Sequence, residues 1–87
     1  MTADELAAAI EDTDVPALLE SLGFRSEFVA EKVLSTSGPV TVSQVAMLWM
    51  GMPNKHDRKR TRQLLEALAD AGLLERAGED EYKTTLR

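Results

Sequence analysis

Cysteine is absent from this chain, and His56 is its single histidine. Protein zinc sites are built mainly from cysteine thiolates and histidine imidazoles, so the composition excludes a zinc site of that kind. Disulfide bonds and thiolate chemistry are excluded as well, and the lack of cysteine fits a reducing compartment. The sequence therefore predicts no bound metal ion.

Glycine is sparse and never clustered, since its five copies stand singly at positions 23, 38, 51, 72 and 78. This spacing excludes a glycine-rich phosphate loop. His56 has no neighbouring nucleophile, and the acidic run at 79–81 is typical of a solvated turn rather than a pair of catalytic carboxylates. The sequence thus predicts a protein that is not an enzyme and uses no cofactor.

Long apolar runs are missing too. No stretch approaches the roughly 20 apolar residues that a membrane-spanning helix requires. The acidic start, MTADELAAAIEDTD, lacks the apolar core of a signal peptide. The 87 residues suffice for one hydrophobic core and are too few for a cleft between two lobes. We expect a single domain over residues 1–87 that is cytoplasmic and does not bind membranes.

Helix-forming residues dominate the first part of the chain, residues 1–38. Residues 3–11 are rich in strong helix formers, and Leu6 and Ile10 share one helical face. A second helix is predicted to begin after Asp14, whose side chain suits a helix N-cap, and to end at Gly23.

A third helix is expected to begin at Ser26, which we assign as its N-cap. Gly38-Pro39 is expected to end it. Its apolar stripe at helical spacing consists of Phe28, Val29, Val33 and Leu34. None of these N-terminal helices carries a chemical motif.

The second half of the chain predicts two helices joined by a turn. Thr41 and Gln44 match the capping-box pattern, so a helix is expected from Val42 to Met50. Residues 51–54 supply glycine, proline and asparagine for a turn, and a long helix is expected from Lys55 to Ala71.

The long helix is predicted to be amphipathic. Its inward face consists of Thr61, Leu64, Leu65 and Leu68. After Gly72, the segments LLERA and EYKTTL predict two strands joined by a turn at 78–80. In this hairpin, the residues available for pairing are Leu74, Tyr82 and Thr84.

Basic charge is concentrated at the start of the long helix. Half of the ten basic residues lie within the segment NKHDRKRTR, namely Lys55, Arg58, Lys59, Arg60 and Arg62. Residues 55–62 carry a local charge of +4, whereas the whole chain carries -5. Such asymmetry indicates either a solvated helix face or a localised anion-binding surface on an otherwise repelling body.

The order of elements from Val40 onward resembles the winged helix-turn-helix family of DNA-binding proteins. The segment VTVSQVAMLWMGMP resembles the first helix and turn, and RTRQLLEALADAGLLERAGEDEYKTT resembles the recognition helix, the corner after it and the wing. The resemblance implies an α+β, mostly helical fold. It would comprise extra N-terminal helices in residues 1–38, a helix-turn-helix over 41–71 and a C-terminal β-hairpin wing over 73–86.

This resemblance implies sequence-specific binding of duplex DNA by a small transcriptional regulator. The second helix of such a pair lies in the major groove, and the first crosses the backbone. By position, the residues expected to face the groove are Lys59, Arg62 and Gln63, and those expected to meet phosphates are Lys55, Arg58 and Arg60. A homodimer on a palindromic site is a further expectation, through the N-terminal helices or the apolar helix.

A winged-helix module that docks on and modulates a protein partner is the alternative hypothesis. The wing tip at 78–81 is acidic, unlike many DNA-binding wings, and would be repelled by phosphate. In residues 45–53, one helix face can bury Val45, Ala46 and Trp49. The remaining apolar side chains are Met47, Leu48, Met50 and Met52. Either the N-terminal helices cover them, or they form a contact surface for a partner.

Overall fold

The computed structural model describes residues 3–35 and 38–85, without the side chains of Ala3, Trp49 and Met50. The N-terminal part forms α1 (Ala3–Glu11), α2 (Val15–Leu22), α3 (Ser26–Val29) and one π-helical turn, η1 (Ala30–Leu34). The rest forms β1 (Val40–Thr41), α4 (Val42–Met50), α5 (Lys55–Asp70), β2 (Leu74–Gly78) and β3 (Glu81–Thr84). The expected α+β class, mostly helical, is confirmed.

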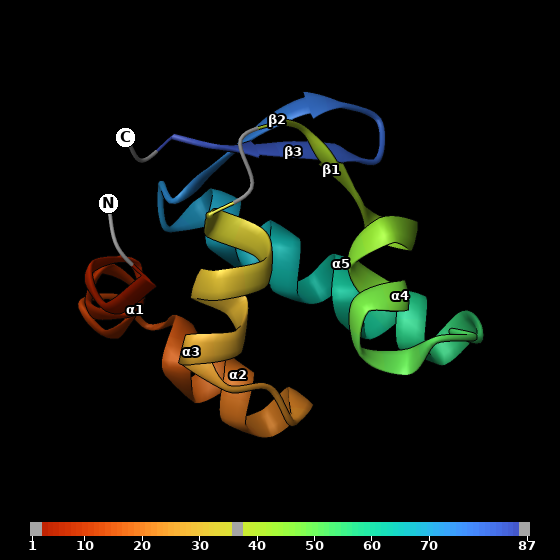
Figure 1. Cartoon of the computed structure of the whole chain (residues 1–87), viewed down its shortest axis with the longest axis horizontal. Coiled ribbons are helices and arrows are strands. Elements are labelled where there is room, and N and C mark those ends of the chain that lie inside the picture. The colour runs from red at the N-terminus through yellow and green to blue at the C-terminus, as the bar shows by residue number, and fades with distance from the viewer. Residues whose placement is uncertain (1–2, 36–37, 86–87) are drawn as a thin grey trace.

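Within the described residues the strands form one three-stranded antiparallel sheet in the order β1-β3-β2, which lies over one side of the helices (Figure 1). The predicted hairpin is confirmed, with Leu74 opposite Thr84 and Arg76 opposite Tyr82. Strand β1 was not expected from the sequence. It pairs Val40 with Tyr82. A strand of two residues is too short to show the alternation of apolar and polar side chains by which strands are recognised in a sequence.

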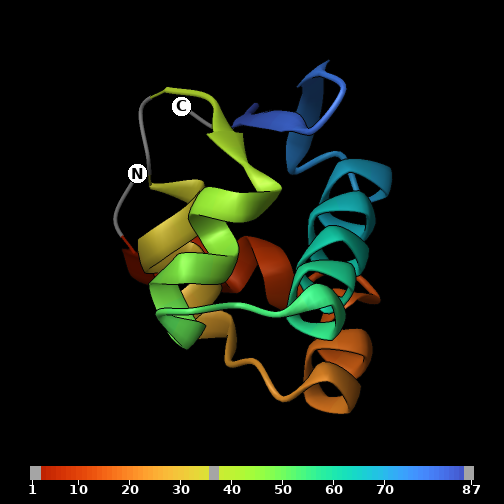
Figure 2. The same ribbon diagram turned by 90° about the vertical axis from the view of Figure 1, so that its right-hand side faces the viewer.

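Helix α5 packs against α2, α4 and β2. Figure 2 shows it running beside α4 and beneath the sheet. The predicted inward face is confirmed, because Thr61, Leu64, Leu65 and Leu68 are fully buried. Each buried leucine contributes about 1.5–3 kcal/mol relative to an exposed one. The apolar face of α5 therefore fixes which of its sides remains available to solvent.

Helix α4 begins and ends where the sequence predicts. The Thr41 hydroxyl accepts from the Gln44 amide at 3.1 Å, and the Gln44 side chain accepts from the Thr41 amide at 3.0 Å. Gly51 follows with φ 66, in the region of positive φ that favours glycine. The turn to α5 occupies residues 51–54.

A second capping box, which the sequence analysis missed, begins α5. The Asn54 side chain accepts from the Asp57 amide at 2.9 Å, and the Asp57 carboxylate accepts from the Asn54 amide at 3.0 Å. An N-x-x-D pattern is the signal that could have predicted it. Because of this box, the basic residues start in the first helical turn rather than in a loop.

The expected cap of α2 by Asp14 is wrong. Asp14 has φ -85 and ψ 0 and makes no side-chain cap hydrogen bond, whereas caps usually have extended backbone. The Thr13 hydroxyl binds the start of α2 instead. It accepts from the Val15 amide at 3.1 Å and donates to the Ile10 carbonyl at 2.6 Å. The end of α2 at Gly23, with φ 86, is as predicted.

The expected cap by Ser26 is also wrong. Ser26 is the first residue of α3, and its hydroxyl donates to the Glu11 carboxylate at 3.0 Å, which ties α1 to α3. Helical backbone ends with η1 at Leu34, before the expected stop at Gly38-Pro39. Residues 36 and 37 lie outside the described residues.

Replacing Asn54 with alanine is expected to lower the free energy of unfolding by about 1 kcal/mol, because the Asp57 amide loses its acceptor. Urea unfolding followed by circular dichroism measures the change. The control is Gln63→Ala, at an exposed position on the same helix, which should alter stability by less than about 0.5 kcal/mol. Equal urea midpoints for Asn54→Ala and wild type would contradict the role of this cap.

Candidate nucleic-acid interface

Four cations share one face of the first two turns of α5. Their spacing of i, i+3, i+4 and i+7 places them on the same side of the helix, and each is exposed: Lys55, Arg58, Lys59 and Arg62. They line a groove of about 480 Å³ together with Val42 and Ser43 of α4 and Asp80 of the hairpin. We call this surface the basic groove. Cations at a helix N-terminus are disfavoured by the helix dipole, so stability alone does not explain their placement.

Arg60 lies apart from the other predicted DNA contacts. Its Nη2 donates to the Asp57 carboxylate at 3.2 Å, and its Nη1 donates to the Leu22 carbonyl at 3.2 Å. The guanidinium also lies 5.9 Å from the centre of the Phe24 ring. Arg60 therefore faces the connection between α2 and α3, and the structure does not bring it into the basic groove with its neighbours.

Gln63 is exposed one residue beyond Arg62 and four residues beyond Lys59. The four-residue spacing places Gln63 beside Lys59 on the helix surface, at the border of the basic groove. His56 is exposed as well, in the first turn of α5. Both side chains are thus on the solvent side of the helix.

Asp80 brings a carboxylate into the basic groove from the tip of the hairpin. Its Oδ1 lies 2.6 Å from Nη1 of Arg62, and both side chains are half exposed. The hydrogen bond to Asp80, followed by the charge of that carboxylate, raises the pKa of Arg62 above its ordinary value. Arg62 is therefore already paired within the folded chain.

A second set of contacts fixes the hairpin to α5. Arg76 of β2 donates to Glu66 at 2.9 Å and to Asp70 at 3.0 Å, and the Tyr82 hydroxyl donates to Glu66 at 3.0 Å. Arg62, Glu66 and Asp70 are spaced four residues apart, so all the hairpin partners lie in one row along α5. Sequence reasoning missed this row. Its signal is a cation followed by two carboxylates at a spacing of four residues.

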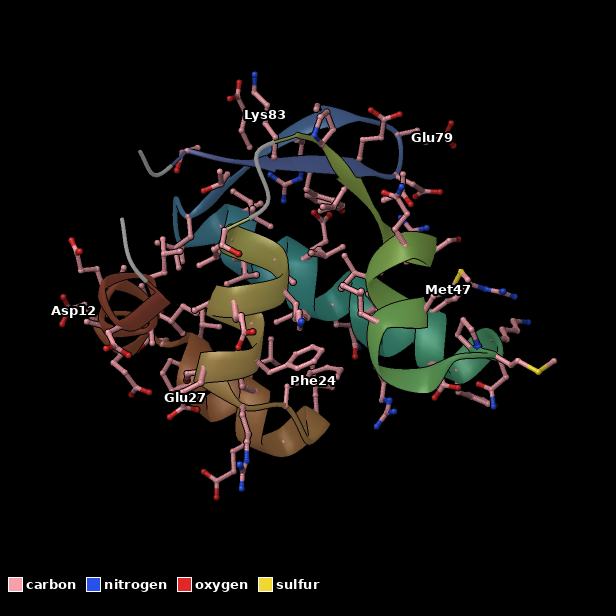
Figure 3. All side chains as sticks on the ribbon, viewed as in Figure 1. Asp12, Phe24, Glu27, Met47, Glu79 and Lys83 are labelled. Carbon is pink, nitrogen blue, oxygen red and sulfur yellow. The ribbon has the colours of Figure 1, made fainter. Side chains whose placement is uncertain are left out.

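Three apolar side chains are exposed on α4 and in the turn that follows it. Met47 is 58% exposed, Leu48 50% and Met52 92%, and Figure 3 shows Met47 pointing away from the body of the molecule. The N-terminal helices therefore do not cover them. Val45 and Ala46 are buried, as predicted. The side chains of Trp49 and Met50, predicted respectively as core and contact residues, lie outside the described residues.

Comparison of the chain with models of protein families, with curated proteins and with solved structures finds no match. Within residues 3–35 and 38–85, no group of three or more His, Cys, Asp or Glu side chains could hold a metal ion. Over the same residues, no helix is both long and apolar enough to cross a bilayer. The geometry of the basic groove is thus the basis for assigning a function.

Tyr82 offers a test of the contacts between the hairpin and α5, because the chain contains a single tyrosine. Burial of the phenol, followed by its hydrogen bond to Glu66, raises the pKa of Tyr82. A near-ultraviolet absorbance titration should therefore show tyrosinate forming above the usual pKa of about 10. Because folding raises this pKa, the associated stability is present below about pH 10 and is lost as pH rises through the folded pKa.

The control for this titration is Glu66→Gln. It should lower the pKa of Tyr82, since the carboxylate disfavours the charged phenolate, while burial continues to raise it. A wild-type midpoint at or below the ordinary tyrosine value would contradict the buried, Glu66-bonded position of Tyr82.

Proposed function

We propose that this chain is a winged-helix protein that binds duplex DNA through the first two turns of α5. The observation that carries the proposal is the basic groove, with exposed cations on one face of a capped helix. Two further features support it. Helices α4 and α5 are joined by a four-residue turn, residues 51–54, which contains glycine and has the length typical of helix-turn-helix units. The hairpin follows α5 directly, where a wing is expected.

In the proposed complex, α5 enters the major groove, which is wide enough for a helix with its side chains. Lys59, Arg62 and Gln63 would meet base edges, and Lys55 and Arg58 would meet phosphates. Helix α4 would cross the backbone. Arg60 has no role in this arrangement because its guanidinium is held by Asp57 and Leu22.

The negative charge of the remaining chain confines DNA to this one surface. Since the net charge is -5, the surface outside the basic groove repels phosphate. A protein of this kind holds DNA in one orientation, which sequence-specific recognition requires. We therefore extend the proposal to a small transcriptional regulator.

A fluorescence titration with duplex DNA tests this proposal. The four cations of the basic groove would each displace about one counterion from the DNA, whether they meet a phosphate or a base edge. The logarithm of affinity should therefore fall against the logarithm of salt concentration with a slope of about -3.6. Replacing Arg58, Lys59 and Arg62 together with alanine should weaken binding at least about 100-fold and flatten the slope by about 3 units.

The matched control is Arg25→Ala, which removes a cation from an exposed position between α2 and α3. It should change affinity by less than about twofold, because Arg25 lies outside the basic groove. Lack of binding by wild type at about 50 mM salt, or full binding by the triple variant, would contradict the proposal.

The exposed apolar side chains favour a second candidate function, a protein-interaction module. Met47, Leu48 and Met52 lie on α4 and the adjacent turn, and methionine adapts to varied partner surfaces. Apolar side chains exposed together are typical of binding sites. The candidate contact surface comprises these three residues, and a second copy of the chain is one occupant to be tested.

Replacing Met47 and Leu48 with serine is expected to abolish this protein contact and leave the stability of the fold nearly unchanged, because both side chains are at least half exposed. Sedimentation velocity tests a second copy as the partner, and a pull-down tests other proteins. The control is the triple basic-groove variant, which should retain the partner. If the serine variant retained the protein partner as well as wild type does, this function would be contradicted.

A further inference from the structure

Asp80 is an acidic residue placed among cations. It belongs to the lining of the basic groove, where its carboxylate lies 2.6 Å from the Arg62 guanidinium. Carboxylates and phosphates accept from a guanidinium in the same way, with oxygens that pair with its N–H donors. The Asp80 carboxylate therefore occupies, on Arg62, the place that an anionic ligand would take.

The backbone holds Asp80 in this place from two sides. The Val42 amide at the start of α4 donates to the Asp80 carbonyl at 3.1 Å. Glu81, the next residue, pairs with Thr41 of β1. The hairpin is also tied to α5 through Arg76 and Tyr82. The tip is thus a fixed part of the groove wall, and only the side chain of Asp80 has to rotate for Arg62 to be released.

We propose that Asp80 is an internal competitor that DNA must displace from Arg62. This inference rests on the proposed function and concerns the regulation of the same site. An isolated anion gains little by opening the pair, because it exchanges one acceptor on Arg62 for another. Duplex DNA offers phosphates to Lys55 and Arg58 and a base edge to Lys59 at the same time, and these contacts offset the cost of opening. Asp80 therefore weakens binding of small anions more than binding of a correctly seated duplex.

Asp80→Asn tests this role with the protein otherwise intact. Asparagine keeps the backbone carbonyl that Val42 contacts and removes the charge that holds Arg62. We expect duplex DNA to bind Asp80→Asn about fivefold more tightly than wild type. This gain is the upper end of what breaking an exposed ion pair costs. The salt slope should stay near the wild-type value, because Arg62 reaches DNA in both proteins once Asp80 is displaced.

A double-mutant cycle separates competition at Arg62 from general repulsion of DNA by the acidic tip. In the Arg62→Ala background, Asp80→Asn should improve affinity by less than about twofold, since the pair no longer exists. The matched control is Glu79→Gln, which removes a charge from the same tip (Figure 3) and leaves the carboxylate of the Asp80–Arg62 contact in place. It should change affinity by less than about twofold.

The outcomes distinguish this inference from the function on which it rests. If wild type binds DNA and Asp80→Asn gives no gain, or if the gain persists without Arg62, the competitor role is overturned and the proposed function stands. If neither wild type nor Asp80→Asn binds DNA, both are overturned. Binding by Asp80→Asn alone would contradict DNA binding by the wild-type chain, and it would overturn the competitor role as well, because duplex DNA would then fail to displace Asp80.

Discussion

The buried carboxylate of Asp57 is the constraint on which the interface depends. The side chain of Asp57 is 10% exposed, its carboxylate completes the capping box with Asn54, and it accepts from the guanidinium of Arg60. A carboxylate near a helix N-terminus also offsets the repulsion that the helix dipole exerts on the neighbouring cations. Asp57 helps to start the helix at Lys55 and holds Arg60 on the side of α2. The other four cations of the basic segment then share one face of the helix, the basic groove.

The same helix positions the hairpin, so the basic groove and the hairpin are joined through α5. The row formed by Arg62, Glu66 and Asp70 accepts contacts from three hairpin residues, whereas the adjacent face carries the groove cations. Arg62 belongs to both. This shared residue connects the acidic tip of the hairpin to the basic groove. Under the proposed function, it would give the hairpin a role other than direct contact with DNA.

The sequence predicts several elements that depend on local signals, whereas the helix caps assigned to Asp14 and Ser26 are wrong. The Thr41 capping box, the turn at 51–54 and the leucine face of α5 follow from spacing alone, and the structure has them where expected. Contacts between segments distant in the chain leave no such pattern. Neither the bond from Arg60 to Leu22 nor the pair formed by Arg62 and Asp80 is visible until the helix and the hairpin are placed together. Sequence reasoning therefore found the basic segment and could not determine which of its cations remain available.

Nuclear magnetic resonance of the isotope-labelled chain during titration with duplex DNA tests the central claim most directly, because each backbone amide reports its own environment. The account predicts the largest shift changes at residues 42–43, at 55–63 and at Asp80, with little change across α1 and α2. Changes that are largest in α1 and α2, or an unchanged spectrum at the start of α5 in the presence of bound DNA, would contradict it.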